Sequence, residues 1–559
     1  MGAHERSTWE SIAIIGTCTL SMMLTIASSS AASISLPTIG RDLDIVEYNL
    51  QWIVSAFNLS SGCLLLLMGR LADLYGRKHV FLLGVAFIGI FSLGAGFSQD
   101  EITLDVLRGI QGIGGAAVIP ASLGILAHSF PPSRTRSIAF ATFAAGAPMG
   151  GAIGNIIGGA LTQLTKPTWR SSFFLIAGLS LAAFVGGLFS IDKDVAYEGI
   201  DRRVDWFGAF LVTAGLVFIC FALSDGPIAP KEFKTGYIIA LLVLGFVLLI
   251  VFLVWQGYLE RLHEDADDTH NWWTPPPLMK VTVWTRSNWR MAVILWIAFF
   301  EWSSFQAWQF WAQLYYQNYL NLSPVLTMIR FIPMSVTGCI CNIIVAIFVG
   351  RVPVVYLIVL GTTATACAGL LYAVIDTSSP YWAFGFPSSV ISVFGADFVF
   401  ASGTLFVAKI SLLHEQSLTG ALFQTMTQLG TSFGLAITTI IFNSTLKKES
   451  EKLGVAVNLS GTNAPPAAQL KAYRAAMWGA FAFGMFGALL AALFLRSVGI
   501  VGHSDEDERM LKEDEETSRD EKEKGVAEVD DAGSERTRAP RLSEDSKRGE
   551  KQTEQRVEE

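Results

Sequence analysis

The sequence has few of the features that would suggest an enzyme. Its six cysteines all fall inside apolar runs, and its seven histidines are scattered along the chain. We therefore expect no disulfide framework, no metal site and no catalytic cluster. A glycine-rich phosphate loop ending in lysine and serine or threonine is also absent from the sequence, which excludes ATP binding through such a loop. These absences predict a protein that is not an enzyme and uses no cofactor.

Charged residues are scarce between residues 11 and 497, where runs of about 20 apolar residues recur. A run of that length crosses ~30 Å of hydrocarbon as a helix. We predict an all-α membrane protein with about fourteen transmembrane helices. The predicted spans are 11–36, 50–70, 79–97, 102–127, 137–163, 171–190, 206–223, 236–257, 290–317, 326–349, 354–374, 381–409, 418–442 and 474–496.

These spans divide into six, then two, then six, which is the layout of two helix bundles around a central site. Residues 503–559 hold 21 acidic and 12 basic residues and few large apolar ones, so we expect this tail to be disordered. The predicted segments are a cytosolic N-terminus at 1–10, a first six-helix half at 11–190, a linker with two extra spans at 191–289, a second six-helix half at 290–497 and an acidic cytosolic tail at 498–559.

Lys and Arg are more frequent in the loops that share a side with the N-terminus, over the first eight spans. Such a bias marks the cytosolic side, so we expect both termini in the cytosol. We expect the plasma membrane as the location, with the vacuolar membrane as the alternative. The late loop at 443–473 carries four lysines and departs from the bias. Three glycosylation sequons, at Asn321, Asn443 and Asn458, fall on the predicted outer side.

The loop after the second span reads Gly69-Arg-Leu-Ala-Asp73-Leu-Tyr-Gly76-Arg77-Lys78. A reversal this tight needs glycine for its backbone freedom. An aspartate at a helix end can bind a helix N-terminus or an arginine. We predict that this loop gates the inner face, and an ordinary basic inner loop is the alternative.

Span 4 carries two charges and span 5 carries a regular series of glycines. Asp105 and Arg108 share a helix face, and an arginine inside a span is normally partnered or faces water. A structural ion pair is one interpretation of these two residues. The span-5 glycines recur every four residues and predict close packing against another helix. They are Gly146, Gly150, Gly154 and Gly158.

These stretches resemble the signatures of the major facilitator superfamily. The 69–78 loop is similar to its inner-loop motif, and span 4 is similar to a motif whose arginine is linked to proton movement. The glycine series resembles the motif of drug:proton antiporters. Stretches beginning at Leu36, Val204 and Gln428 resemble the fourteen-spanner branch. Within that branch the chain looks most like fungal aminotriazole-resistance and low-affinity ammonium transporters, over roughly residues 10–497.

Some positions depart from the family pattern. Leu74 stands where a basic residue is usual, and Asn155 stands where a proline usually follows the third glycine. Ser28 stands where many fourteen-spanner exporters carry an aspartate, so we expect no proton coupling through that position. The corresponding loop of the second half, at 350–354, lacks an acid. We therefore expect any latch to be stronger in the first half.

The second half contains two acids near the middle of spans, Glu301 and Asp397. Burial at that depth disfavours a charged carboxylate, so either acid could exchange protons, and a hydrogen-bonded structural acid is the alternative. Span 9 is also rich in tryptophan and glutamine. We predict that part of this span lines a substrate cavity, with helix-packing aromatics as the alternative. The predicted cavity residues are Trp302, Gln306, Trp308 and Gln309.

The resemblance implies a monomeric secondary transporter that binds a small molecule and moves it across the bilayer by alternating access. It further implies export of organic molecules in exchange for protons. We take Asp105 and Arg108 of span 4, together with the mid-span acids Glu301 and Asp397, as the candidate proton relay. A uniporter or importer of a small inorganic solute, such as ammonium or borate, is the alternative that Ser28 and Asn155 favour. An enzyme or a receptor fits less well, and we expect no nucleic-acid partner.

Overall fold

The computed structural model describes residues 7–45, 52–131, 133–193, 203–226, 229, 231–264, 274–412, 415–455, 464–496 and 499–500. The sequon at Asn458 and the predicted tail beyond residue 500 lie outside these residues. All of the helices named below belong to one compact unit, which ends at His503.

The first half is built from long antiparallel helices, several of which begin at polar caps. Ser7 and Glu10 form a capping box at the start of α1. Asp100 accepts a hydrogen bond from the N–H of Thr103 at 2.8 Å, and Ser133 caps α6. The helices of this half are α1 (Thr8–Asp42), α2 (Trp52–Cys63), α3 (Leu65–Tyr75), α4 (Arg77–Gly96), α5 (Glu101–Ser129), α6 (Arg134–Leu164) and α7 (Arg170–Ser190).

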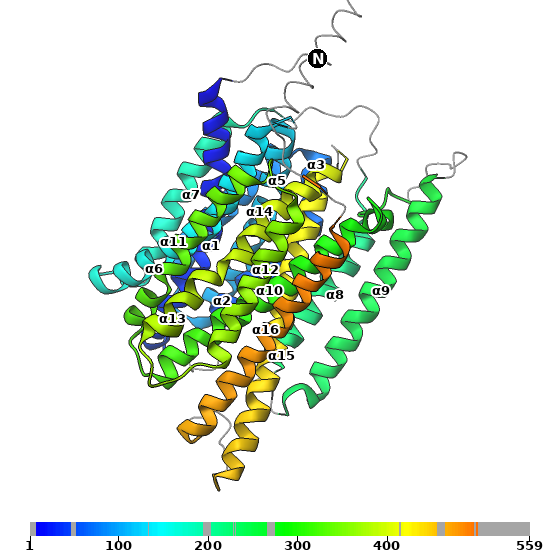
Figure 1. Cartoon of the computed structure of the whole chain (residues 1–559). Helices are drawn as coiled ribbons and strands as arrows, with labels where there is room; N and C mark the ends of the chain where they lie inside the picture. The colour runs from blue at the N-terminus through cyan, green and yellow to red at the C-terminus, as the bar shows by residue number, and fades with distance from the viewer. Residues whose placement is uncertain are drawn as a thin grey trace, which may run out of the picture. The chain divides into compact units, whose positions relative to one another are not determined.

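Two further helices form the insert between the halves, α8 (Trp206–Asp225) and α9 (Gly236–Glu264). Asp205 joins them, because it caps α8 through the N–H of Gly208 and accepts hydrogen bonds from Trp255 and Gln256 of α9. The hairpin includes the short turn η1 (Glu232–Lys234). α8 packs on α2 and α3 of the first half and on α15 of the second, whereas α9 packs mainly on α8 and lies at the edge of the bundle (Figure 1).

The second half begins after the short turn η2 (Val281–Thr285). Its first helix ends in a π-helical turn, η3 (Tyr315–Tyr319). The helices of this half are α10 (Arg290–Leu314), α11 (Pro324–Phe348), α12 (Val354–Ala373), α13 (Tyr381–Ile391), α14 (Val393–Ile410), α15 (Gln416–Lys452) and α16 (Pro466–Phe494).

Twelve spans in the described part of the chain are long and apolar enough to cross a membrane, or thirteen if the bent pair α2–α3 counts as one span. The bend between α2 and α3 is 48°. α13 and α14 together count as one span. The fourteenth predicted span corresponds to α10, a helix of 25 residues that is not among the thirteen. Its glutamate, glutamines and tryptophans lower its mean hydropathy.

The two halves repeat the same packing. α1 packs on α6 and α7, as α10 packs on α15 and α16, and α4 packs on α5 and α7, as α12 packs on α14 and α16. The halves meet where α6 packs on α11 and where α15 packs on α2 and α3. This confirms the predicted architecture of two six-helix halves with a two-helix insert.

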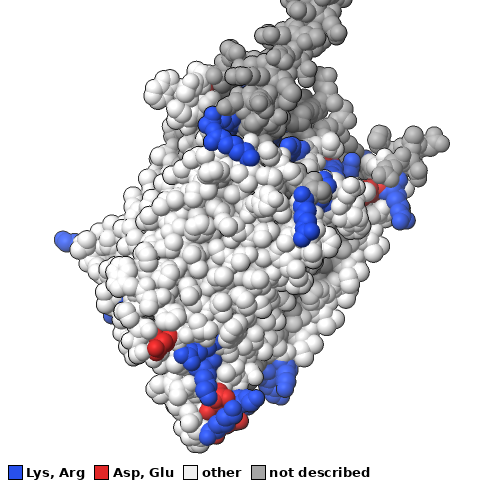
Figure 2. All heavy atoms as spheres, in the orientation of Figure 1, with Lys and Arg blue, Asp and Glu red and all other residues white. Residues whose placement is uncertain are grey.

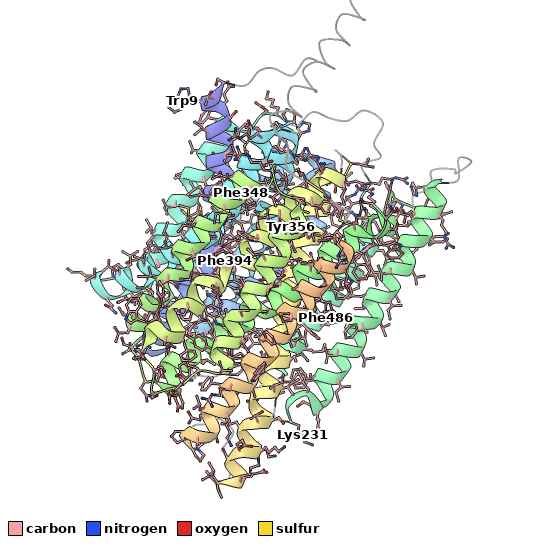
Figure 3. All side chains as sticks on the ribbon, viewed as in Figure 1. Trp9, Lys231, Phe348, Tyr356, Phe394 and Phe486 are labelled. Carbon is pink, nitrogen blue, oxygen red and sulfur yellow. The ribbon has the colours of Figure 1, made fainter. Side chains whose placement is uncertain are left out.

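The bundle has two polar ends separated by an apolar belt. Trp9 lies at one end and Lys231 at the other (Figure 3). Because α3 ends at the same end as Trp9 (Figure 1), we call this the Asp73 end and the opposite one the Asn321 end. Figure 2 shows Lys, Arg, Asp and Glu gathered at these two ends of the visible face, with uncharged residues between them. Exposed Leu, Ile, Val and Phe side chains are numerous, as expected for a surface that contacts lipid.

Candidate functional site

The junction between the two halves at the Asp73 end is held by a carboxylate. Asp73, on α3, accepts hydrogen bonds from the backbone N–H groups of Ser417 at 3.3 Å and Leu418 at 2.9 Å. These groups belong to the first turn of α15, whose own N-cap residue, Glu415, makes no side-chain cap. A carboxylate placed there satisfies free N–H groups and meets the positive end of the helix dipole. Asp73 therefore caps a helix of the opposite half.

The other residues of the predicted gating loop surround this contact. Arg77 donates to Asp73 at 3.3 Å, and Lys78 donates to the backbone oxygens of Leu188 and Ile191 at the end of α7. Gly76 has φ of 107° between α3 and α4, a conformation that favours glycine.

Gly69 allows the close approach of the two halves. A Cβ atom at Gly69 would lie 2.7 Å from the Cβ of Ala421 and 3.0 Å from the backbone oxygen of Ser417. Both contacts are with α15. A larger residue at this position would push α3 and α15 apart.

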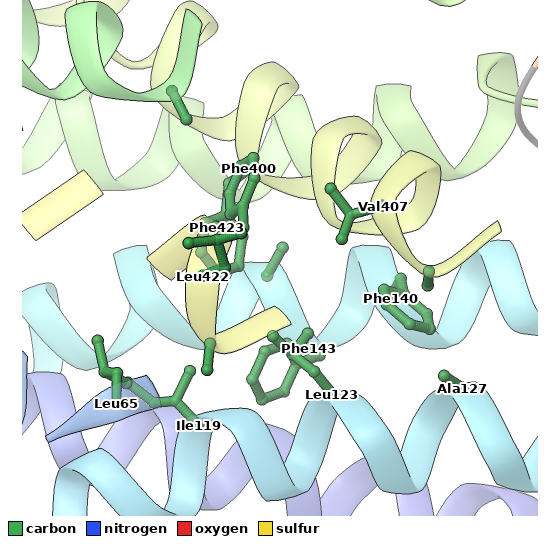
Figure 4. Close-up of a cluster of buried hydrophobic side chains, with 14 of the residues drawn as sticks. Leu65, Ile119, Leu123, Ala127, Phe140, Phe143, Phe400, Val407, Leu422 and Phe423 are labelled. Atoms are coloured by element: carbon green, nitrogen blue, oxygen red, sulfur yellow. The ribbon is translucent and has the colours of Figure 1, made fainter. Parts of the chain in front are cut away.

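Apolar side chains of both halves also pack together, and we call this cluster the seal (Figure 4). Phe143 of α6 stacks on Phe400 of α14 with 6.5 Å between ring centroids. Leu123 of α5 lies against Gly420 of α15. The halves are thus closed together at this end. The seal comprises Leu65, Ile119, Leu123, Ala127, Phe140 and Phe143 of the first half and Phe400, Val407, Leu422 and Phe423 of the second.

Arg108 is fully buried inside the first half. Its guanidinium donates to the backbone oxygen of Ile53 at 2.9 Å, to Ser28 Oγ at 3.0 Å and to Gln111 Oε1 at 2.7 Å. It also lies 4.5 Å from the ring centroid of Phe57, a distance suited to a cation–π interaction. The residue that replaces the family aspartate, Ser28, is therefore a direct partner of this arginine.

Asp105 does not pair with Arg108 through a hydrogen bond. Its Oδ1 is buried without a hydrogen-bond partner among the described residues, although the two residues are one turn apart on α5. The ion pair considered from the sequence is replaced by neutral partners, because the Arg108 side chain extends toward α1 and α2.

The glycines of span 5 lie against α1. A Cβ atom at Gly150 would lie 2.5 Å from the backbone oxygen of Met23, and one at Gly154 would lie 2.6 Å from that of Ala27. Gly146 and Gly158 make equally close contacts with the same helix. The adjacent Gly151 has nothing within 4 Å of its Cβ position. The series thus serves packing within one half.

Glu301 lies in the interior of the second half. A Cβ atom at Gly395 of α14 would lie 2.2 Å from its Oε1, and both carboxyl oxygens are buried without a hydrogen-bond partner among the described residues. The nearby hydroxyl of Thr365 donates elsewhere, to the backbone oxygen of Ser392. Gly395 and Thr365 both belong to the same half as Glu301.

Asp397 lies where α11 crosses α6. It accepts a hydrogen bond from Asn342 Nδ2 at 2.8 Å. A Cβ atom at Gly338 of α11 would lie 2.9 Å from Asp397 Oδ2 and 2.8 Å from the Cβ of Pro148 on α6. A single glycine therefore separates this acid from the other half. Nothing in the sequence pattern pointed to Asn342.

The four predicted cavity residues on α10 do not share one environment. Trp302 is partly exposed and lies against Phe400 of the seal. Gln306 and Gln309 are also partly exposed. Trp308 is fully buried and donates to Ser388 Oγ at 2.8 Å. It lies in an aromatic cluster of the second half, so the structure places it away from the face that carries the other three.

Polar contacts outside the spans tie further elements together. Trp169 Nε1 donates to Asp42 at 3.0 Å and Arg170 pairs with the same carboxylate, and both hold the pKa of Asp42 below its usual range. Arg286, beside η2, pairs with Glu415 at 2.6 Å. No sequence pattern predicted the second pair, because its two residues are far apart along the chain.

The sequons differ in surroundings. Asn321 lies in the loop just after η3, with φ of 53°. Asn443 is half-buried within α15. In the described residues there is no group of three or more His, Cys, Asp and Glu side chains that could hold a metal ion.

Comparison with known proteins places this geometry in context. Residues 18–203 match the model of the Major Facilitator Superfamily. Relatives include MFS-type transporter 1 of Pyricularia oryzae, 26% identical over 90% of this chain and 86% of the relative. The low affinity ammonium transporter of Saccharomyces cerevisiae is 28% identical over 77% of this chain and 81% of its own length. The puromycin resistance protein pur8 of Streptomyces alboniger is 28% identical over 78% and 82%.

Among solved structures, the human organic anion transporter MFSD10 superposes with a TM-score of 0.59 at 12% identity. The match covers 86% of this chain and 99% of that one. At this low sequence identity the match shows a shared fold and nothing about function.

Proposed function

Because the chain belongs to the major facilitator superfamily, we propose that it is a secondary active exporter that moves small organic molecules out of the cytosol in exchange for protons. In this proposal the Asp73 end faces the cytosol, both termini are cytosolic, and the protein works as a monomer in the plasma membrane or the vacuolar membrane. The moving bodies are the halves at 11–190 and 290–497.

The observation that carries the proposal is the contact of Asp73 with the first turn of α15. This contact joins the two halves at the Asp73 end. Its groups, a carboxylate on one half and backbone N–H groups on the other, can separate without disrupting the helix packing inside either half. Separation at this end would break the two hydrogen bonds of Asp73 and the one from Arg136 to Ala408, part the seal and open a path from the cytosol. This is the behaviour required of an inner gate in alternating access.

Exchange for protons is supported by two buried acids in the second half. Neither Glu301 nor Asp397 forms an ion pair with a Lys or Arg among the described residues. Export of organic molecules is supported by the puromycin resistance relative and by the partly exposed face of Trp302, Gln306 and Gln309. Tryptophan and neutral amides suit a substrate that stacks and accepts or donates hydrogen bonds.

The second candidate is a uniporter or importer of a small inorganic solute. The low affinity ammonium transporter among the relatives and the place of Ser28 beside Arg108 favour it, because the acid expected at position 28 of an antiporter is replaced by a neutral side chain. Glycosylation at Asn321, Asn443 and Asn458 is a separate proposal that follows from the assigned orientation.

Purified full-length protein in liposomes separates the two candidates. Puromycin and isotopically labelled ammonium serve as probes, each with and without an imposed pH gradient. We expect puromycin movement that accelerates when protons flow the opposite way. Ammonium movement that ignores the gradient, with no movement of puromycin, would establish the second candidate instead.

A further inference from the structure

The two buried acids of the second half differ in what surrounds them. Glu301 lies beside Gly395 and Thr365, which both belong to its own half. Asp397 lies beside Gly338, which touches Pro148 of the other half. When two rigid bodies rock against each other, the surroundings of a group inside one body do not change. Only an acid at the crossing experiences a different environment in each state.

The Asp397 site is built from oxygen and amide groups. Asn342 Nδ2 donates both to Asp397 Oδ1 at 2.8 Å and to the backbone oxygen of Gly338 at 2.9 Å. Asn342 Oδ1 is buried without a hydrogen-bond partner among the described residues. A buried acceptor without a donor is costly. Such an acceptor next to a carboxyl is satisfied if the carboxyl carries a proton and the amide turns to receive it.

Among the described residues, no Lys or Arg forms an ion pair with Asp397. The titratable groups that face it are the thiols of Cys339 and Cys341 on α11. α6 presents Pro148, and Glu301 of α10 lies on the opposite side of α14, at Gly395. Among the described residues of α12, α13 and α15, no charged side chain is paired with Asp397. A carboxylate left alone in this position would be strongly disfavoured.

The first half lacks such a site. Gly62 contacts α15 as Gly338 contacts α6, and Gly115 contacts Thr25 as Gly395 contacts Glu301. This register puts Leu66 in the place of Asn342 and Ala117 in the place of Asp397. Both are buried apolar residues. The polar pair is therefore not required by the packing of the fold.

From these contacts we propose that Asp397 is the group that binds and releases the transported proton, and that Asn342 is its positioning residue. Gly338 leaves the carboxyl open toward the crossing, so separation of α6 from α11 exposes it to water. With α6 packed against α11, the neutral acid is favoured. Glu301 then remains protonated throughout and serves as a structural acid. The inference rests on the proposed proton exchange and assigns it to one site.

Infrared spectroscopy of the carboxyl C=O stretch measures this proton without any knowledge of the substrate. The full-length protein in lipid nanodiscs is titrated between about pH 5 and pH 9, and the protonated-carboxyl band is followed. We expect a band that fades with rising pH in the wild type and in Glu301→Gln. We expect the pH-dependent part to be lost in Asp397→Asn and retained in Asp397→Glu, which also shows that the site tolerates substitution.

Asn342→Ala tests the positioning role. Asn342 is the hydrogen-bond partner of the carboxyl, so we expect its removal to shift the midpoint of the titration by about one pH unit, a tenfold change in proton affinity. A purely structural role would lower stability and leave the midpoint in place, and that result would overturn the assignment of Asn342.

Three outcomes would overturn the proton site. These are an unchanged titration in Asp397→Asn, loss of the band only in Glu301→Gln, and displacement of the band by Na⁺ at constant pH, which would indicate a metal-cation site. Failure of the proposed substrate class is separate. If neither puromycin nor ammonium moves in the liposome assay, the proposed substrates are wrong, but the infrared titration still tests whether Asp397 binds the proton.

Discussion

The two junctions between the halves are built on the same plan but closed differently. At one, α15 lies against α2 and α3, with Gln428 against Gly62. At the other, α6 lies against α11, with Pro148 against Gly338. Gln428 and Pro148 each stand two residues before a glycine, Gly430 and Gly150, that packs on the neighbouring helix of its own half.

The difference lies at the helix N-termini. In the register set by Gly62 and Gly338, Val349 takes the position of Asp73. α6 is capped by its own Ser133, whereas α15 is capped by Asp73 from the opposite half. A cap within the same half is kept when the halves separate, and a cap from the opposite half is lost. The first junction therefore carries a helix cap that is lost on separation, whereas α6 keeps its own cap and contacts the second half through the hydrogen bond from Arg136 to the backbone oxygen of Ala408 at 3.3 Å.

Removing the charge of Asp73 should have the largest effect. A hydrogen bond to a charged group contributes about 1.5–3 kcal/mol, so we expect Asp73→Asn to shift the balance toward an open Asp73 end by about tenfold and to slow transport. Spin labels at the exposed positions Tyr75 and Leu412, in a background without native cysteines, measure this opening as a longer distance.

The matched control is Ser133→Ala at the other junction. It removes a local cap worth about 1 kcal/mol, so we expect slightly lower stability and no change in the label distance. Equal opening in both variants would remove the distinction between the two junctions.

Next in size is the effect of Gly150→Ala, which tests close packing inside one half. Its new methyl group would meet the backbone of Met23, and overpacking costs about 1–3 kcal/mol. We expect a lower Tm in detergent with an unchanged label distance at the Asp73 end. Gly151→Ala is the control, because its Cβ position faces open space, and its Tm should not fall. A low Tm in both variants would contradict the packing role of the series.

Trp308→Phe and Gln309→Ala separate structure from substrate binding on α10. Trp308→Phe loses the hydrogen bond to Ser388, which costs about 1 kcal/mol, and should lower the Tm while preserving substrate preference. Gln309→Ala should keep the Tm and change which probe is moved faster. If only Trp308→Phe changes which probe is moved faster, Trp308 and not Gln309 contacts the substrate.

The smallest effect concerns Asp42, whose contacts with Trp169 and Arg170 stay within the first half. Its pKa is lowered in the folded protein, so the contact stabilises at neutral pH and is lost as the pH falls through the lowered value. We expect Asp42→Asn to reduce the Tm by a degree or so at pH 7, and the difference to disappear well below pH 4. A difference that persists there would rule out the charged contact.

Much of the site followed from local pattern. The position of Gly69, Asp73 and Gly76 at a tight reversal, and the packing of the Gly150 series, depend on spacing of three or four residues, which a sequence displays directly. The residues that these side chains contact could not be predicted from the sequence. Asp73 binds Leu418, Arg108 binds Ser28, and Trp308 turns into its own bundle, because each contact joins segments that only the packing of helices brings together.

The sequence by itself determined that the chain crosses a membrane many times in two similar halves, because apolar length and glycine spacing are properties of single segments. Tertiary structure alone decided which acid meets which helix. Asp397 and Glu301 look equivalent in the sequence, as two acids in apolar spans. One lies at the crossing of the halves and the other inside a single half, and that difference in surroundings determines how each can respond when the halves move.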